Sequence, residues 1–134
     1  MKKCSSIVLI DDNSIDNLVN SELIKELDIS ESILIMEDGI KGITYLRQLG
    51  LNGHPPSLIF LDLNMPHFNG FDFMQELNSF PSEFRQEVKV IVLTSSLNES
   101  DFEEAKNCGC DGYLIKPLTT EMIMDEFEKV FYYE

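Results

Sequence analysis

Apolar residues along the chain form two kinds of pattern: short continuous runs, and longer stretches in which they recur at helical spacing. Continuous runs rich in β-branched residues are typical of strands buried on both faces of a parallel sheet, and the longer spacing is typical of amphipathic helices. The runs that predict strands are residues 7–10, 33–36, 58–61, 88–93 and 113–115. The stretches that predict helices are about 14–27, 40–49, 71–77, 98–106 and 119–131. The pattern therefore predicts five strands and five helices in strict alternation.

Strict alternation of strands and helices predicts an α/β fold, doubly wound, in which a five-stranded parallel sheet lies between two layers of helices. A length of 134 residues is that of one ordinary domain, so residues 1–134 are expected to form a single three-layer sandwich. In sheets of this kind, ligands bind beyond the carboxyl ends of the strands, near the point where the strand order reverses. The polar residues that follow each strand are therefore the candidates for function.

Charge and hydropathy exclude several classes of protein. The 10 Lys and Arg residues against 24 Asp and Glu residues give a net charge of −14, which argues against binding of nucleic acid or of an anionic membrane surface as the main activity. The apolar run at 7–10 is too short for a signal peptide, and no apolar stretch is long enough to span a bilayer. Three cysteines, an odd number, are expected to be reduced thiols. A cytoplasmic protein is expected.

Four of the five predicted strands end in side chains that can take part in chemistry. These residues are Asp11 and Asp12 after the first strand, Asp62 after the third, Thr94 at the end of the fourth and Lys116 after the fifth. The three aspartates are expected to converge, because the first and third strands adjoin where the strand order reverses. Crowded carboxylates repel one another unless a cation neutralises them, and an oxygen-rich set of this kind suits Mg²⁺.

The other two side chains suit a phosphoryl group beside that metal. The Lys116 ammonium can pair with an anion, and the Thr94 hydroxyl can donate a hydrogen bond to a phosphate oxygen. An aspartate can act as a nucleophile and form an aspartyl phosphate, and Asp62 begins a loop that leaves room beside it. The residues thus predict an Asp62 nucleophile, with Asp11 and Asp12 holding the metal.

Four segments resemble the sequence motifs of the receiver domains of two-component response regulators, most closely the single-domain, chemotaxis-type proteins. The segments are Ile10-Asp11-Asp12-Asn13, Leu61-Asp62-Leu63-Asn64-Met65-Pro66 with Gly70, Val92-Leu93-Thr94-Ser95-Ser96, and Gly112-Tyr113-Leu114-Ile115-Lys116-Pro117. They occur in the family's order and span essentially the whole chain. The resemblance implies a flavodoxin-like sheet with strand order 2-1-3-4-5. Because the chain ends soon after the last predicted helix, no output domain is expected.

The resemblance also implies roles for individual residues. Asp62 would accept a phosphoryl group from a sensor histidine kinase or a histidine phosphotransfer protein. Mg²⁺ would be bound by Asp12, Asp62 and the main-chain carbonyl of Asn64, with Asp11 acting directly or through water. A cis bond would precede Pro117, and phosphorylation would move Thr94 toward the phosphoryl group while Tyr113 turns inward. Such a protein promotes only its own phosphorylation and dephosphorylation, so it is not expected to be an enzyme.

The signal of a chain without an output domain must leave through contact with another protein. The resemblance places the contact surface within residues 98–134, which hold ten acidic residues against three basic ones and thus half of the net charge. Two interpretations remain open: this acidic surface binds a basic patch of a partner, or it is simply a solvated face.

Three other functions share parts of this pattern. A receiver-like adaptor would bind partners without being phosphorylated, but the complete set of acids, hydroxyl and lysine argues against it. A phosphatase of the haloacid dehalogenase type requires an acid two residues after its nucleophile, where this chain has Asn64. A flavodoxin-like cofactor binder requires a phosphate-binding loop after the first strand, where the acidic pair would repel a phosphate.

Overall fold

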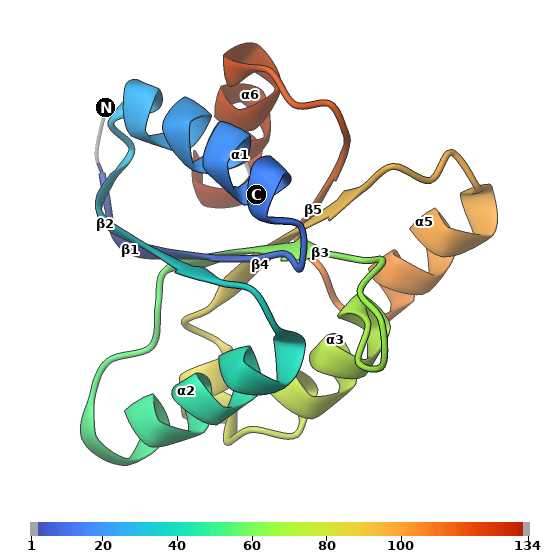
Figure 1. The fold of residues 1–134 in the computed structure, drawn as a ribbon. Helices are drawn as coiled ribbons and strands as arrows, with labels where there is room; N and C mark the ends of the chain where they lie inside the picture. Colours follow the sequence, from blue (N-terminus) through green and yellow to red (C-terminus); the bar gives the residue numbers. More distant parts are fainter. Residues whose placement is uncertain (1–2, 133–134) are drawn as a thin grey trace.

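The computed structural model describes residues 3–132, apart from the side chain of Asn52, and within that range it has five strands and six helices (Figure 1). The strands are β1 (Cys4–Ile10), β2 (Ser30–Met36), β3 (Leu58–Asp62), β4 (Lys89–Thr94) and β5 (Gly112–Ile115). The helices are α1 (Ser14–Leu27), α2 (Gly39–Asn52), α3 (Gly70–Asn78), α4 (Ser82–Arg85), α5 (Glu99–Asn107) and α6 (Thr120–Tyr132). All five predicted strands and all five predicted helices are present, and α4 is additional.

All five strands are parallel and lie in the order β2-β1-β3-β4-β5, which confirms the predicted α/β fold and its strand order. Ile10 of β1 is level with Leu61 of β3, so the residues that follow them, Asp11 and Asp62, lie side by side. Asp62 is in turn level with Leu93 of β4. The register therefore brings the ends of the three central strands to one edge of the sheet.

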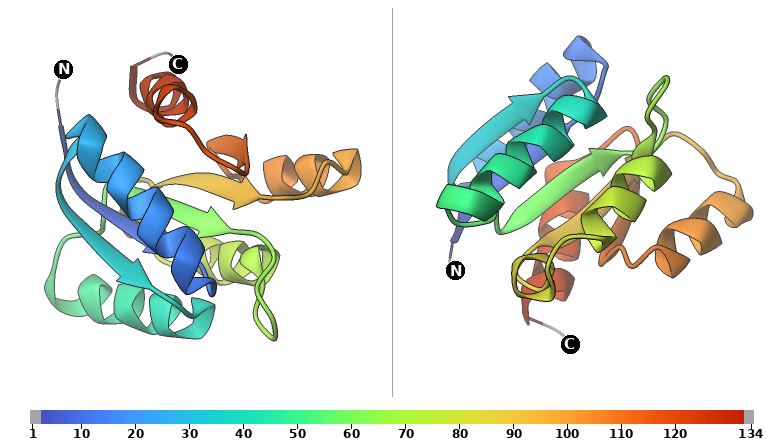
Figure 2. Two further views of the ribbon diagram at one scale, coloured as in Figure 1. Left: turned by 45° about the horizontal axis from the view of Figure 1, so that its top comes forward. Right: turned by 90° about the horizontal axis from the view of Figure 1, so that it is seen from below.

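Alternate residues of β1, β3 and β4 face two separate cores, because successive side chains of a strand point to opposite faces of the sheet. Helices α1 and α6 cover one face, and α2, α3 and α5 cover the other (Figures 1 and 2). The core under α1 and α6 includes Ile7, Leu9, Phe60, Leu93, Ile24 and Phe127. The opposite core includes Val8, Ile10, Leu61, Val92, Leu46 and Phe73. Apolar residues in continuous runs are thus used by both faces, as expected for a parallel sheet.

The additional helix α4 lies in the segment between α3 and β4, where the sequence predicted no helix. It has only four residues, about one helical turn, so it leaves no periodic pattern to detect. Its buried Phe84 packs against Phe80, with 5.2 Å between ring centroids. Arg85 at its end donates hydrogen bonds to the carbonyl oxygens of Val88 and Gly109, at 2.9 and 3.2 Å. The prediction of five helices was wrong by this one turn.

No helix within residues 3–132 is long and apolar enough to cross a membrane. The cysteines Cys4, Cys108 and Cys110 are free thiols.

Candidate functional site

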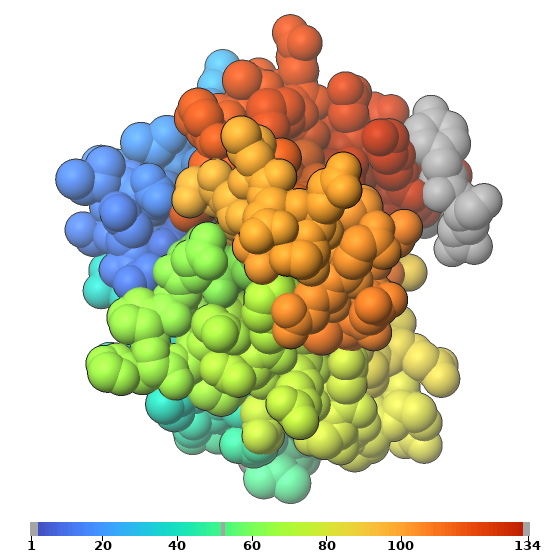
Figure 3. All heavy atoms as spheres, turned by 90° about the vertical axis from the view of Figure 1, so that its right-hand side faces the viewer, coloured from blue at the N-terminus to red at the C-terminus, as the bar shows by residue number. Residues whose placement is uncertain are grey.

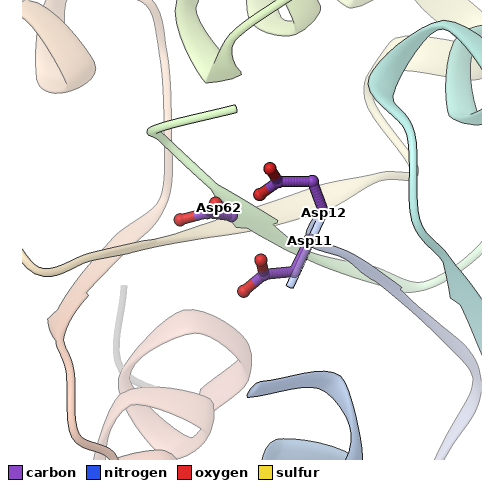
Figure 4. A group of neighbouring side chains, drawn as sticks. All are labelled: Asp11, Asp12 and Asp62. Atoms are coloured by element: carbon purple, nitrogen blue, oxygen red, sulfur yellow. The ribbon is translucent and has the colours of Figure 1, made fainter. Parts of the chain in front are cut away.

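Three carboxylates converge at the carboxyl ends of β1 and β3, as predicted (Figure 4). One oxygen atom from each of Asp11, Asp12 and Asp62 lies within 4.8 Å of the other two. Asp11 and Asp62 are buried, whereas Asp12 is exposed to solvent. A cation held by these oxygens would therefore have protein ligands on one side and water on the other, which is the coordination that Mg²⁺ prefers.

The start of α1 fixes the position of Asp11. Asn13 caps the helix, and its side chain accepts hydrogen bonds from the backbone N–H groups of Ile15 and Asp16. The backbone N–H of Asn13 donates to the Asp11 carboxylate at 2.9 Å. The buried side-chain amide of Asn17 donates to the Asp11 carbonyl oxygen at 2.8 Å. Side chain and main chain of Asp11 are thus both held in place by the first turn of the helix.

The loop that follows β3 is held tightly against the strand. Asn69 and Asp72 form a capping box at the start of α3, in which each side chain accepts the other's backbone N–H. Gly70 donates its N–H to the carbonyl oxygen of Leu63 at 3.0 Å. A Cβ atom at Gly70 would lie 2.9 Å from the Asp62 carbonyl oxygen, so only glycine fits without a shift of the backbone. This packing fixes the position of Asp62.

Lys116 links the aspartates of three segments. The peptide bond between Lys116 and Pro117 is cis, as the sequence motif implied. The lysine Nζ donates to Asp11 at 2.7 Å, to Asp16 at 2.9 Å and to Asp62 at 3.3 Å. Burial disfavours the ammonium, but the hydrogen bonds to Asp11 and Asp16 and the charge of Asp62 outweigh it and raise the lysine pKa. Lys116 is therefore positively charged at neutral pH.

One lysine does not neutralise this site. Burial, and then the charge of Asp11, raise the pKa of Asp62 to about 6, although Lys116 opposes the shift. A raised pKa means that the ionised form of Asp62 is disfavoured by its surroundings. A divalent cation at the three converging carboxylates would remove that repulsion. The donor set and its charge thus fit a hard divalent cation.

The two remaining candidates lie on β4 and β5. Thr94 is buried, and its hydroxyl oxygen accepts hydrogen bonds from the Asn64 side-chain amide at 3.1 Å and the Ser96 N–H at 3.0 Å. The Tyr113 ring packs edge-on against Phe102 of α5, with 5.1 Å between centroids. Its hydroxyl group is buried, which raises the tyrosine pKa, and the Thr94 side chain is the neighbouring group that opposes this rise by hydrogen bonding. Tyr113 therefore lies inward, between the sheet and α5.

Asp16 is a further site residue that was not predicted from the sequence; its carboxylate pairs with Lys116. The signal was present but weak: Asp16 lies four residues after Asp12, in the first turn of a predicted helix. That helix begins directly after the first predicted strand, so its first turn had to lie near the ends of the strands. The partner lysine, 100 positions further along the chain, could not be inferred from that spacing.

The orientation of α1 also differs from what its apolar spacing suggests. Its outward side exposes three apolar residues, here called the α1 face: Ile15 (71% exposed), Leu18 (63%) and Val19 (51%). Its inward side buries three polar residues, Asn17, Asn20 and Ser21. The helical spacing of the apolar residues predicted the helix correctly, but half of those residues point away from the core.

A groove runs along α5 and β5, on the side of the molecule where the strands end. In Figure 3, α5 lies between the segment after β3 and helix α6. The groove has a volume of about 470 Å³ and is lined mainly by Leu97, Phe102, Tyr113, Ile115 and Met122. Glu99 lines the groove, and Glu103 and Glu104 of the same helix are exposed. The surface expected to carry the output thus has an apolar floor and an acidic border.

Comparisons of this chain with known proteins all point to the same family. The family model for the response regulator receiver domain matches residues 7–128. Over 112 residues, the chain is 33% identical to the response regulator Rcp1 of Synechocystis sp., which covers 82% of this chain and 75% of Rcp1.

Solved structures agree. The crystal structure of a two component response regulator from Cytophaga hutchinsonii superposes with a TM-score of 0.87 at 32% identity, over 96% of this chain and 98% of that one. The Mn²⁺-bound form of Rcp1 gives a TM-score of 0.75 at 29% identity, over 97% and 95%. The phosphorylated cyanobacterial phytochrome response regulator RcpA gives 0.77 at 28%, over 94% and 92%.

Proposed function

Because this chain belongs to the family of response regulator receiver domains, we propose that residues 1–134 act as one receiver unit that accepts a phosphoryl group on Asp62. Receiver domains are signalling modules of two-component systems, and they interact with histidine kinases and downstream effectors. The observation that carries the proposal is the convergence of Asp11, Asp12 and Asp62 with Lys116 at one edge of the sheet. Phosphorylated RcpA supports it as a structural relative.

The chemistry follows from the groups present. An Asp62 carboxylate oxygen attacks the phosphorus of a phosphohistidine, a new P–O bond forms, and the P–N bond breaks with its electron pair leaving on the imidazole nitrogen. Lys116 and the Thr94 hydroxyl donate hydrogen bonds to the oxygens of the transferred group. The raised pKa of Asp62 makes its carboxylate more basic than an ordinary aspartate while leaving it mostly ionised at neutral pH.

Receiver domains bind a divalent metal at an acidic pocket, which in this chain comprises Asp11, Asp12 and Asp62. The Mn²⁺-bound form of Rcp1 is a relative with such an ion. For this chain we propose Mg²⁺, held by these carboxylates and by the Asn64 main-chain carbonyl. When bound, Mg²⁺ neutralises negative charge on the transferring phosphoryl group.

The phosphodonor protein is proposed to dock on the α1 face. A donor histidine must reach Asp62, and α1 begins beside that residue, with Asp16 of its first turn in contact with the site lysine. Exposed apolar residues that lie together on a surface mark protein–protein contacts, because leaving them in water is unfavourable. Ile15, Leu18 and Val19 form such a group on the first turns of α1.

The output is proposed to leave through the groove between α5 and β5. A phosphoryl group on Asp62 would draw the Thr94 hydroxyl away from Asn64 and Ser96, which it now contacts. Tyr113 lies inward beside α5, so when Thr94 shifts, the tyrosine ring and the Phe102 ring that packs against it can move as well. A local change of charge would thus bias a surface to which a downstream protein binds.

The test is direct phosphorylation. With acetyl phosphate and Mg²⁺, the wild-type chain should gain the mass of one phosphoryl group, detected by intact-protein mass spectrometry, and the Asp62→Asn variant should gain none. Asp28→Asn is the matched control, because Asp28 is exposed, pairs with Lys3 and has a left-handed backbone conformation that asparagine tolerates. A gain that persists in Asp62→Asn would remove Asp62 as the acceptor. No gain in the wild type would favour the adaptor, and rapid turnover of a phosphate ester would favour the phosphatase.

A further inference from the structure

We infer that Asp16 is a positioning residue for Lys116. In the unphosphorylated site Asp16 holds the lysine ammonium, and on phosphorylation it competes with the phosphoryl group for that ammonium. The inference rests on the phosphoacceptor function proposed above. It adds to the site a residue that lies outside the four sequence motifs, on the first turn of α1.

The distances show how the lysine is shared. An ammonium group has three N–H donors, and in this site each has a carboxylate partner. The contacts with Asp11 and Asp16, at 2.7 and 2.9 Å, are short, whereas the contact with Asp62 is 3.3 Å. The ammonium is therefore drawn toward β1 and α1 and away from the residue that accepts the phosphoryl group.

Asp16 is the partner that the lysine can release most easily. The side chains of Asp11 and Asp62 are 0% and 6% exposed, and a buried carboxylate without its cation is strongly disfavoured. The side chain of Asp16 is 39% exposed, so water can replace the lysine as its partner. When a phosphoryl oxygen requires a donor, Lys116 can move toward it by giving up Asp16.

The charge of Asp16 has opposite effects on the two ligands of the site. It adds a negative charge to a group of three carboxylates, which favours binding of a divalent cation. The same charge repels a phosphoryl group and holds back the lysine that would bind it. Neutralising Asp16 should therefore weaken metal binding and strengthen binding of a phosphoryl analogue.

The experiment measures both affinities in the Asp16→Asn variant. Mg²⁺ affinity is obtained by isothermal titration calorimetry, and affinity for beryllofluoride, a phosphoryl analogue, by ¹⁹F NMR at saturating Mg²⁺. We expect Mg²⁺ to bind about two- to fivefold more weakly and beryllofluoride about two- to fivefold more tightly, as for a partly exposed ion pair. The Asp16→Glu variant, which keeps the charge, should restore both affinities toward the wild-type values.

Glu22→Gln is the matched control, because Glu22 lies on the same helix, is 64% exposed and pairs with Lys25 at 3.6 Å. It removes the same charge and should leave both affinities unchanged. If Asp16→Asn weakens the binding of both ligands, the role of Asp16 is structural and the inference is wrong. If Asp16→Asn binds both ligands as Glu22→Gln does, Asp16 has no role in the site. If the wild type binds beryllofluoride and Asp16→Asn binds it with the same affinity, this inference is wrong and the proposed function still stands. A wild-type chain that binds neither ligand contradicts the proposed function itself.

Discussion

The helices α1 and α5 begin at the same edge of the sheet but differ in the residues that they expose near that edge. On α1, the outward residues Ile15, Leu18 and Val19 are apolar. On α5, the exposed residues Glu99, Glu103 and Glu104 are acidic, with the exposed Phe102 among them. Their inward sides differ as well: α1 buries Asn17, Asn20 and Ser21 beside Ile24, whereas Ala105 is the buried residue of α5.

The difference indicates that the two helices bind their partners through different forces. Removing an apolar face from water on binding a partner lowers the free energy, and this stabilisation depends little on salt. An acidic face attracts a basic partner over a distance and accelerates association, but salt screens it. If α1 receives the phosphodonor and α5 contacts the output partner, the two interactions should respond differently to mutation and to ionic strength.

The largest effect is expected from a charge placed on the α1 face. Leu18→Glu should reduce the rate of phosphotransfer from the histidine kinase that serves as donor by about ten- to a hundredfold, as for a central interface residue. Phosphorylation by acetyl phosphate should be unchanged, because that small donor needs no docking surface. Transfer is measured with the fastest donor in a panel of purified, autophosphorylated histidine kinases.

Leu51→Glu is the matched control for this prediction. Leu51 is 83% exposed, more than Leu18, but it lies near the end of α2, beside a pocket lined by Arg47, His54 and Phe80 at the other end of the molecule from the carboxylates. The same substitution there should leave transfer unchanged. Equal losses in the two variants would mean that the α1 face is no more than an ordinary part of the surface.

The main features of the fold and site were predictable because they depend on local patterns and on one topological rule. Continuous apolar runs predict buried parallel strands, and polar residues directly after such runs must gather at one edge of the sheet. Asp11 and Asp62 could therefore be placed together without a structure. The cis bond before Pro117 and the strand order came from the resemblance to receiver domains, not from any pattern in the chain.

What could not be predicted depends on individual side-chain contacts rather than on a repeating pattern. The spacing of Leu18 and Val19 predicts a helix, but the side that faces the core is decided by contacts such as the hydrogen bond from Asn17 to the Asp11 carbonyl. The pairing of Asp16 with Lys116 joins the first helix to the residue that directly follows the last strand. Neither contact leaves a periodic signal.

The ionisation of the site should have a smaller, measurable effect on stability. The folded-state pKa of Asp62 is raised to about 6, above its unfolded value, so its contribution to stability is present at low pH and is lost as the pH rises through 6. Without metal at pH 7.5, Asp62→Asn should therefore raise the free energy of unfolding by about 1–2 kcal/mol, and by less at pH 5. Urea unfolding of both proteins in a chelator measures this difference. Millimolar Mg²⁺ should stabilise the wild type and reduce the difference, whereas a difference independent of pH would contradict the raised pKa.

The smallest effect is expected on α5. Binding of a downstream partner should weaken as salt is raised from about 50 to 300 mM, whereas phosphotransfer through the α1 face should change little. Single substitutions Glu103→Gln and Glu104→Gln should each weaken partner binding about two- to threefold at low salt and have no effect at high salt, since both side chains are exposed. Glu83→Gln on α4 is the control, because Glu83 lines the pocket at the opposite end of the molecule. The affinity for the downstream partner is measured at low and at high salt by titration with the phosphorylated protein. Partner binding that is insensitive to salt would mean that the acids of α5 are only a solvated face, and that the apolar floor of the groove, not its acidic border, selects the partner.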